Sequence, residues 1–185
     1  MSEPRRSSVP LSQVRIEGGL LAERQPANRE VSLPVEYQRC EETGRFAVLD
    51  LNWQPGMPYR PHQFYDSDVA KWIEAAAHTL ATHPDPELEA QVDGIIERIA
   101  RAQQPDGYLN TYFTLVEPDK RWTNLRDMHE LYCAGHLFQA AVAHSRVTGS
   151  DRLLAVAQRY ADLICATFGT RHGQVEGAPG HPEIE

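Results

Sequence analysis

The fold of this chain is constrained most strongly by a succession of helical segments in its central and C-terminal parts. Apolar residues there recur at intervals of three and four, the spacing that places them on one face of an α-helix. Four helices are predicted on this basis: Asp68 to His83, Asp85 to Gln104, Asp127 to Thr148 and Asp151 to Phe168. Tight turns join the first helix to the second and the third to the fourth, whereas a long aromatic-rich loop separates the two pairs. This alternation indicates stacked helical hairpins, arranged either as a solenoid or as a closed ring of helix pairs.

The expected helix ends carry capping residues. Asp68, Asp85 and Asp151 each precede an apolar stripe, and an Asp at such a position accepts hydrogen bonds from the first free backbone N–H groups. Pro86 suits the first turn of the second helix, and Gly149 suits the left-handed residue that ends the third. Capping chemistry and periodicity therefore indicate the same boundaries.

The N-terminal third of the chain is less regular. Residues 1–10 are polar and contain proline, so we expect a flexible tail. Residues 11–16 alternate apolar with polar side chains and predict a short β-strand. Weak helical character over 20–42 and a loop rich in proline and aromatic residues over 51–66 follow. We therefore expect an all-α domain over residues 11–185 with a short N-terminal β segment.

The last residues predict the start of another helix. In GHPE, at residues 180–183, Pro182 suits the first turn. A helix that begins there has no apolar face to bury before residue 185. We therefore expect this chain to be the N-terminal portion of a longer helical domain, truncated at its C-terminal end.

Composition argues against several classes of function. Acidic residues outnumber basic ones by 26 to 18, which gives a formal net charge of −8 and argues against nucleic acid as a partner. No apolar run approaches the roughly 18 residues of a membrane-spanning helix, and no apolar segment follows Arg5 and Arg6 as in a secretion signal. Three cysteines are too few, and odd in number, for a disulfide framework. A cytoplasmic protein without a membrane partner is expected.

The third predicted helix carries three residues that can bind metal ions or protons. His129, Cys133 and His136 stand at i, i+4 and i+7, so their side chains leave one face within about two turns. A zinc site is one interpretation, but three ligands on two turns of a straight helix converge poorly on a tetrahedral ion. A Cys133 nucleophile with His129 as base is another, but a thiol in mid-helix gains nothing from the positive helix N-terminus. Packing of Cys133 and His136 against neighbouring helices is favoured.

His129 and His181 differ from those two residues because each stands at the start of a predicted helix. An imidazole there can face a cavity and bond a ligand hydroxyl, and Pro182 favours an extended conformation for His181. Helix starts face the central pocket in helical-ring folds, so the pair predicts a shared binding site. In the loop DGYLNTYF, Asp106 and Tyr108 add the polar and aromatic groups typical of sugar sites.

Four longer motifs follow one another along the chain: FYDSDVAKWIEAAAHTLATHPDPEL, ERIARAQQPDGYLNTYF, HELYCAGHLFQAAVAHSRVTG and GAPGHPEIE. In this order and spacing they resemble glycoside hydrolase family 127, the β-L-arabinofuranosidase-like enzymes, over about residues 10–185. The resemblance implies an (α/α)6 barrel catalytic domain, incomplete in this chain. It also implies removal of terminal β-L-arabinofuranosyl residues from oligosaccharides or glycoconjugates, with retention of configuration.

The resemblance further implies the roles of individual residues. His129, from the HE-x-Y motif, and His181, from GHPE, are implied as hydroxyl contacts around a bound L-arabinofuranose. Asp106 and Tyr108 are implied more weakly, as residues that shape the floor of the pocket. The family's nucleophile is a cysteine thiolate held by zinc, and a glutamate serves as its acid/base.

The three cysteines of this chain, Cys40, Cys133 and Cys165, do not occupy the family's cysteine motif. No nucleophile, acid/base or metal ligand is therefore assigned here, zinc is expected only in the full-length enzyme, and the chain alone is expected to be inactive. A homodimer is considered for the full-length form. Other interpretations stay open: a non-catalytic helical-hairpin module that binds a sugar or a partner protein, and a metal-binding helical protein using His129, Cys133 and His136. Within the enzyme class, a related helical-ring isomerase or a different glycosidase specificity also stays open.

Overall fold

The computed structural model describes residues 9–184. The tail predicted over residues 1–10 lies almost wholly outside this range. The strand predicted over residues 11–16 is wrong: Leu11–Gln13 forms a 3-10 turn, and Val14 after it is extended but isolated. A strand needs a neighbour to pair its backbone N–H and C=O groups. Within residues 9–184 the β-pairing consists of one isolated bridge, between Phe168 and Val175.

The chain is built from α-helices connected by loops and short 3-10 turns. The α-helices are α1 Gly19–Ala27, α2 Leu33–Glu42, α3 Tyr65–Leu80, α4 Pro86–Ala102, α5 Thr111–Leu115, α6 Glu130–Thr148 and α7 Arg152–Thr167. A single π-helical turn, η2 Asn28–Ser32, joins α1 to α2, so the helical run continues past Pro26 and Pro34. The 3-10 turns are η1 Leu11–Gln13, η3 Ala47–Asp50, η4 Pro118–Lys120 and η5 Pro182–Ile184.

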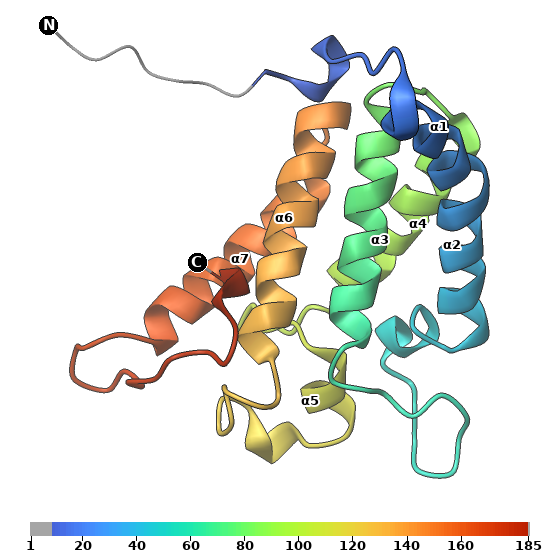
Figure 1. The fold of residues 1–185 in the computed structure, drawn as a ribbon. Coiled ribbons are helices and arrows are strands. Elements are labelled where there is room, and N and C mark those ends of the chain that lie inside the picture. The colour runs from blue at the N-terminus through green and yellow to red at the C-terminus, as the bar shows by residue number, and fades with distance from the viewer. Residues whose placement is uncertain (1–8, 185) are drawn as a thin grey trace, which may run out of the picture.

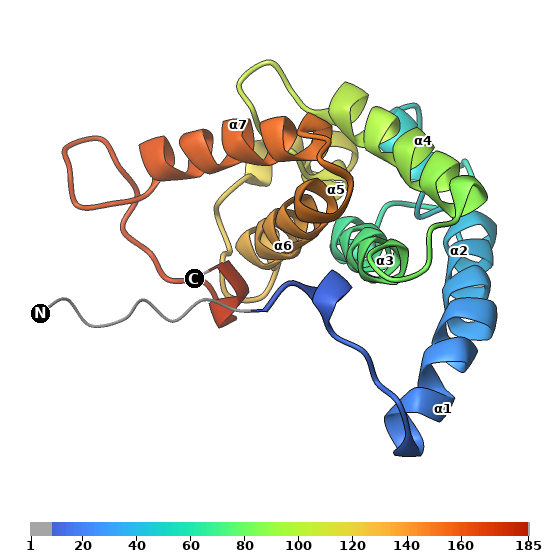
Figure 2. The same cartoon turned by 90° about the horizontal axis from the view of Figure 1, so that it is seen from above.

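The helices form two layers. Helices α3 and α6 lie side by side in an inner layer (Figure 1). Seen from above, α2, α4 and α7 form an arc outside them (Figure 2). The chain therefore passes alternately through the outer and inner layers, as the predicted helical hairpins require.

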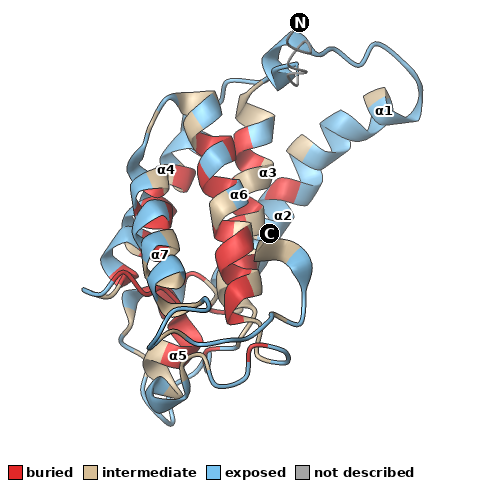
Figure 3. Ribbon diagram, turned by 90° about the vertical axis from the view of Figure 1, so that its left-hand side faces the viewer, coloured by how far each residue is buried: buried red, intermediate tan, exposed pale blue. Residues whose placement is uncertain are grey.

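The core lies between these two layers. Each helix turns its apolar stripe towards its neighbours, and Figure 3 shows the buried residues concentrated along α3 and α6. The stripe of α4 consists of Leu88, Val92, Ile95, Ile96 and Ile99, all buried. At roughly 1.5–3 kcal/mol for each fully buried aliphatic side chain, this stripe is a major source of stability for the outer layer.

The helix caps are partly those that the sequence predicts. Asp85 caps α4, because its Oδ1 accepts the N–H groups of Glu87 at 3.0 Å and Leu88 at 3.2 Å. Asp68 is not a cap, since α3 begins three residues earlier and the Asp68 carboxylate instead accepts the Arg45 Nε–H at 2.7 Å. Asp151 precedes α7 but makes no side-chain cap bond.

The inner helices begin at one end of the molecule, where the long loops gather (Figure 1). Residues 51–64 lead into α3, and residues 116–129 lead into α6. The Gln63 side chain ties the two loops together by donating from Nε2 to the Asp127 carbonyl at 3.2 Å. Loops held on rigid helices position binding groups, so a functional site is expected at this end of the molecule. In the described part of the chain, no helix is both long and apolar enough to cross a membrane.

Candidate functional site

Four ring side chains form a continuous row across the starts of α3, α6 and η5. Phe64 precedes α3, His129 precedes α6, Tyr132 lies in the first turn of α6, and His181 precedes η5. The ring centroids of Phe64 and His129 are 5.1 Å apart, those of His129 and Tyr132 are 5.6 Å apart, and those of Tyr132 and His181 are 4.9 Å apart. We call these four residues the aromatic row. The structure thus brings His129 and His181, which are 52 positions apart in the sequence, to the same Tyr132 ring.

His129 has an unusual backbone and an unpaired ring nitrogen. Its φ of 58° and ψ of 30° lie in the left-handed region, which costs a residue with a side chain about 1–2 kcal/mol. Its carbonyl accepts the Cys133 N–H at 3.0 Å, so this residue is the N-cap of α6. Its Nδ1 is buried and has no hydrogen-bond partner within residues 9–184. Strain together with an unsatisfied polar atom is typical of a position kept for binding.

The His181 ring is held in one orientation by its own backbone. Its Nδ1 accepts the Glu183 N–H at 3.1 Å. A neutral imidazole that accepts at Nδ1 carries its proton on Nε2, so Nε2 is a hydrogen-bond donor. His181 as a whole is exposed.

Tyr132 was not singled out from the sequence, although it stands at the centre of the row. Its hydroxyl accepts a hydrogen bond from Lys71 Nζ at 2.7 Å, which fixes the ring against α3. The His136 ring packs edge-on against it at 4.5 Å. Helical spacing could have revealed Tyr132, because it stands three residues after His129 and residues at i and i+3 share a helix face.

The loop residues Asp106 and Tyr108 lie beneath the start of α6. Tyr108 is fully buried and donates from its hydroxyl to Glu130 Oε1 at 2.5 Å, while the Trp122 N–H donates to Oε2 at 2.8 Å. Burial raises the pKa of Glu130 and, more strongly, that of Tyr108. Asp106 accepts the Tyr108 N–H at 3.0 Å and pairs with Arg121 at 3.1 Å. The buried Tyr108–Glu130 pair supports the start of α6 from inside the molecule, whereas Asp106 is exposed, and Tyr108 has no exposed surface to offer a ligand.

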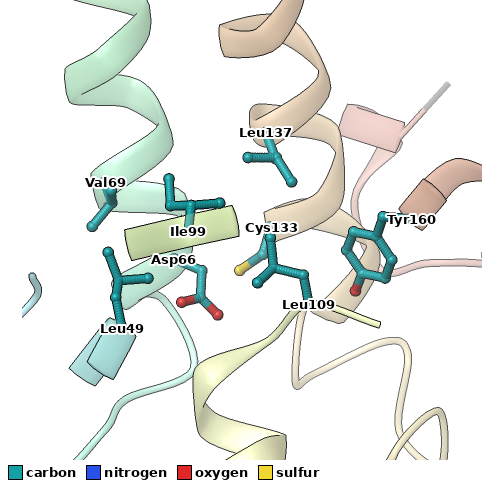
Figure 4. A pocket seen from close by; sticks show the side chains of 8 residues that line it. All are labelled: Leu49, Asp66, Val69, Ile99, Leu109, Cys133, Leu137 and Tyr160. Atoms are coloured by element: carbon teal, nitrogen blue, oxygen red, sulfur yellow. The ribbon is translucent and has the colours of Figure 1, made fainter. Parts of the chain in front are cut away.

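Cys133 faces a small cavity inside the molecule. A cavity of about 20 Å³ is lined by Asp66, Cys133 and Tyr160 among apolar side chains (Figure 4). That volume holds roughly one water molecule and cannot hold a sugar. The Cys133 thiol donates to the Gln63 carbonyl at 3.2 Å, and burial raises its pKa, so the group stays protonated. Cys133 is therefore a packing residue, and the nucleophile interpretation is not supported.

The described residues do not provide a metal site. Within residues 9–184, no three His, Cys, Asp or Glu side chains lie close enough together to hold an ion. His136 instead faces Glu183, with Nδ1 and Oε1 3.3 Å apart. Burial raises the pKa of Cys40 to about 11, and Cys165 is an exposed free thiol. The residues present do not fit the zinc that the family resemblance implies.

The class of this protein follows from comparison with known families. Residues 13–185 match the model of the beta-L-arabinofuranosidase GH127 catalytic domain. The chain therefore belongs to glycoside hydrolase family 127.

Among individual relatives, the non-reducing end beta-L-arabinofuranosidase of Bifidobacterium longum subsp. longum is 50% identical over 126 residues, which are 66% of this chain and 19% of the relative. A GH127 beta-L-arabinofuranosidase from Geobacillus stearothermophilus T6 has a similar structure, with a TM-score of 0.87 and 44% identity over 93% of this chain and 28% of that one. A second solved GH127 beta-arabinofuranosidase gives a TM-score of 0.86 and 34% identity over 94% of this chain and 29% of that one.

These comparisons confirm the predicted fold class. The similar structures are (α/α)6-type helical domains, and this chain follows them closely over nearly all its length. The chain spans about a fifth of the curated relative and less than a third of either solved structure.

Proposed function

We propose that this chain provides part of the sugar-binding wall of a GH127 glycosidase that removes terminal β-L-arabinofuranosyl residues. The observation that carries the proposal is the aromatic row, in which the two imidazoles flank one tyrosine ring at the starts of α6 and η5. Its support from relatives is that two matched proteins carry the name beta-L-arabinofuranosidase.

The two imidazoles have the hydrogen-bonding groups that a sugar needs. Nε2 of His181 is a donor for a hydroxyl oxygen, and the buried, unpaired Nδ1 of His129 is left for an ordered water. A buried polar group left unpaired costs about 1–3 kcal/mol, so a water held there within the sugar site recovers that cost. In this proposal Asp106 and Tyr108 act indirectly, because they fix the turn on which His129 stands.

The reacting groups are assigned elsewhere in this proposal. We place the cysteine nucleophile, the glutamate acid/base and the zinc ligands of a retaining enzyme in residues outside these 185. Support comes from the raised pKa of the buried thiols Cys40 and Cys133, and from the absence of a three-ligand cluster within residues 9–184.

The test uses the chain by itself. Titration with methyl β-L-arabinofuranoside should shift the NMR signals of the His129 and His181 rings and leave the ring of His83, in an exposed turn at the far end of α3, unchanged. The chain should release no L-arabinose from p-nitrophenyl β-L-arabinofuranoside. Unmoved signals would contradict the binding role, and measurable release would contradict the assignment of the reacting groups.

A further inference from the structure

The segment from Gly177 to Ile184 lies unusually close to the start of α6. The Gly180 N–H donates to the Leu125 carbonyl at 3.4 Å. A Cβ atom added to Gly180 would meet the Arg126 carbonyl, and one added to Gly135 would meet the Glu183 carbonyl, each closer than the 3.0 Å limit for real Cβ contacts. Two backbones therefore approach each other at positions where only glycine leaves room.

Gly135 is the more informative of the two glycines. It lies inside α6, where glycine costs roughly 0.5–1 kcal/mol relative to alanine, and its helical backbone needs no left-handed φ. Gly94 in α4 is also inside a helix, but nothing lies within 4 Å of the position that its Cβ would occupy. The glycine at 135 is thus explained by the approach of residue 183 rather than by its own helix.

A second contact holds the same segment from its side chain. Glu183 Oε1 lies 3.3 Å from His136 Nδ1, and both side chains are largely buried, at 15% and 13% exposure. Neither atom has an aligned hydrogen bond within residues 9–184, so the contact is electrostatic. Burial and nearby Lys71 lower the pKa of His136, whereas Glu183 raises it. The net shift is downward, so burial and Lys71 outweigh the effect of the carboxylate on the imidazole.

We propose that Gly135 and Glu183 are positioning residues that hold η5 on α6 and so fix His181 against Tyr132. Because Gly135 has no side chain, the backbone of residue 183 can approach α6 at that position. The Glu183–His136 contact then holds the segment there. His181 is two residues before Glu183, and its ring Nδ1 accepts a hydrogen bond from the Glu183 N–H. The orientation of the ring therefore depends on how this segment docks on α6. This inference rests on the proposed function, because a fixed His181 matters only where it meets a ligand.

The test compares Gly135→Ala with Gly94→Ala, which adds the same methyl group to a helix with open space. In the wild-type chain we expect an NOE between the His181 and Tyr132 rings and slow hydrogen exchange at the Gly180 amide. Gly135→Ala should abolish the NOE, speed Gly180 exchange at least tenfold and weaken binding of methyl β-L-arabinofuranoside at least tenfold. Gly94→Ala should leave all three unchanged.

A second pair of variants covers the case in which Gly135→Ala disturbs α6 itself, which circular dichroism would reveal. Glu183→Ala should also lose the NOE, whereas Glu183→Gln, which can still bond to His136, should retain most of it. Persistence of the NOE in Gly135→Ala or in Glu183→Ala would overturn the inference. The NOE and the exchange rate need no sugar, so a wild-type chain that shows both yet binds no arabinofuranoside would contradict the proposed function and not the docking.

Discussion

His129 combines two features that a residue used only for packing does not need. Its backbone is left-handed, and its buried Nδ1 has no partner within residues 9–184. Phe64 and Tyr132 both pack against the ring. The next residue, Glu130, is anchored by the hydrogen bond that it accepts from the Tyr108 hydroxyl. The surrounding structure therefore maintains the strain, as at binding sites generally.

We predict that His129→Ala weakens binding of methyl β-L-arabinofuranoside by the chain at least tenfold, about 1.4 kcal/mol, because one of two convergent imidazoles is lost. Isothermal titration calorimetry measures this directly. His83→Ala serves as the control, since that side chain lies in an exposed turn. Equal affinities for His129→Ala and the control would remove His129 from the site.

Asp66 gives the folded chain a distinctive dependence on pH. Burial raises the pKa of its carboxyl group from 3.8 to about 6, although the Thr111 N–H donates to Oδ2 at 2.7 Å and opposes the shift. Between about pH 6 and pH 4, the folded state therefore binds a proton that the unfolded state does not. The contribution of Asp66 to the free energy of unfolding therefore becomes more favourable as the pH falls through that window and less favourable as the pH rises.

We predict that the free energy of unfolding of Asp66→Asn, relative to wild type, is higher at pH 7 than at pH 4.5. The amide keeps an acceptor for Thr111 but cannot ionise, so the difference between the two proteins reports this one group. Urea denaturation at both pH values measures it. A difference that does not change with pH would show that the Asp66 pKa is not raised.

At the scale of single residues, the sequence predicts His129 and His181 as a pair because both precede helix starts. It does not reveal Tyr132 and Glu183 as their supports. Tyr132 could have been found from its helical spacing. Glu183 could not, because its contact with His136 joins segments 47 positions apart and depends on the bare backbone at Gly135.

The helices themselves follow from local sequence wherever an apolar stripe and a cap agree. Asp85 begins α4 as predicted, and the stripe of α4 is buried. The strand over residues 11–16 fails because alternation alone supplies no pairing partner. Asp68 fails as a cap because α3 begins at Tyr65, which places Asp68 inside the helix, where its carboxylate pairs with Arg45. The errors thus lie where the apolar pattern alone fixes neither a pairing partner nor a helix start.

The caps provide a prediction at the scale of an element. Asp85→Ala should lower the free energy of unfolding by about 1 kcal/mol, because two N–H groups of α4 lose their acceptor. Asp151→Ala should cost less, since Asp151 precedes α7 without a side-chain cap bond. Chemical denaturation compares the two variants. A larger loss for Asp151→Ala would show that the assignment of caps is wrong.

At the scale of the whole molecule, the alternation of outer and inner helices places the starts of α3 and α6 together (Figures 1 and 2). The order of hairpins and loops that the sequence predicts implies this arrangement, but it does not give the distances between the rings. Exposed apolar side chains on α1 and η2 include Leu20, Leu21 and Val31. The fold thus brings the aromatic row to one end of the molecule.

The central claim is that the rings of His129 and His181 act on one sugar. The most direct measurement is of intermolecular NOEs between methyl β-L-arabinofuranoside and the histidine ring protons of the 185-residue chain. We predict NOEs from the same bound sugar to both rings and none to His83. NOEs to neither ring, or to only one of the two, would contradict the claim.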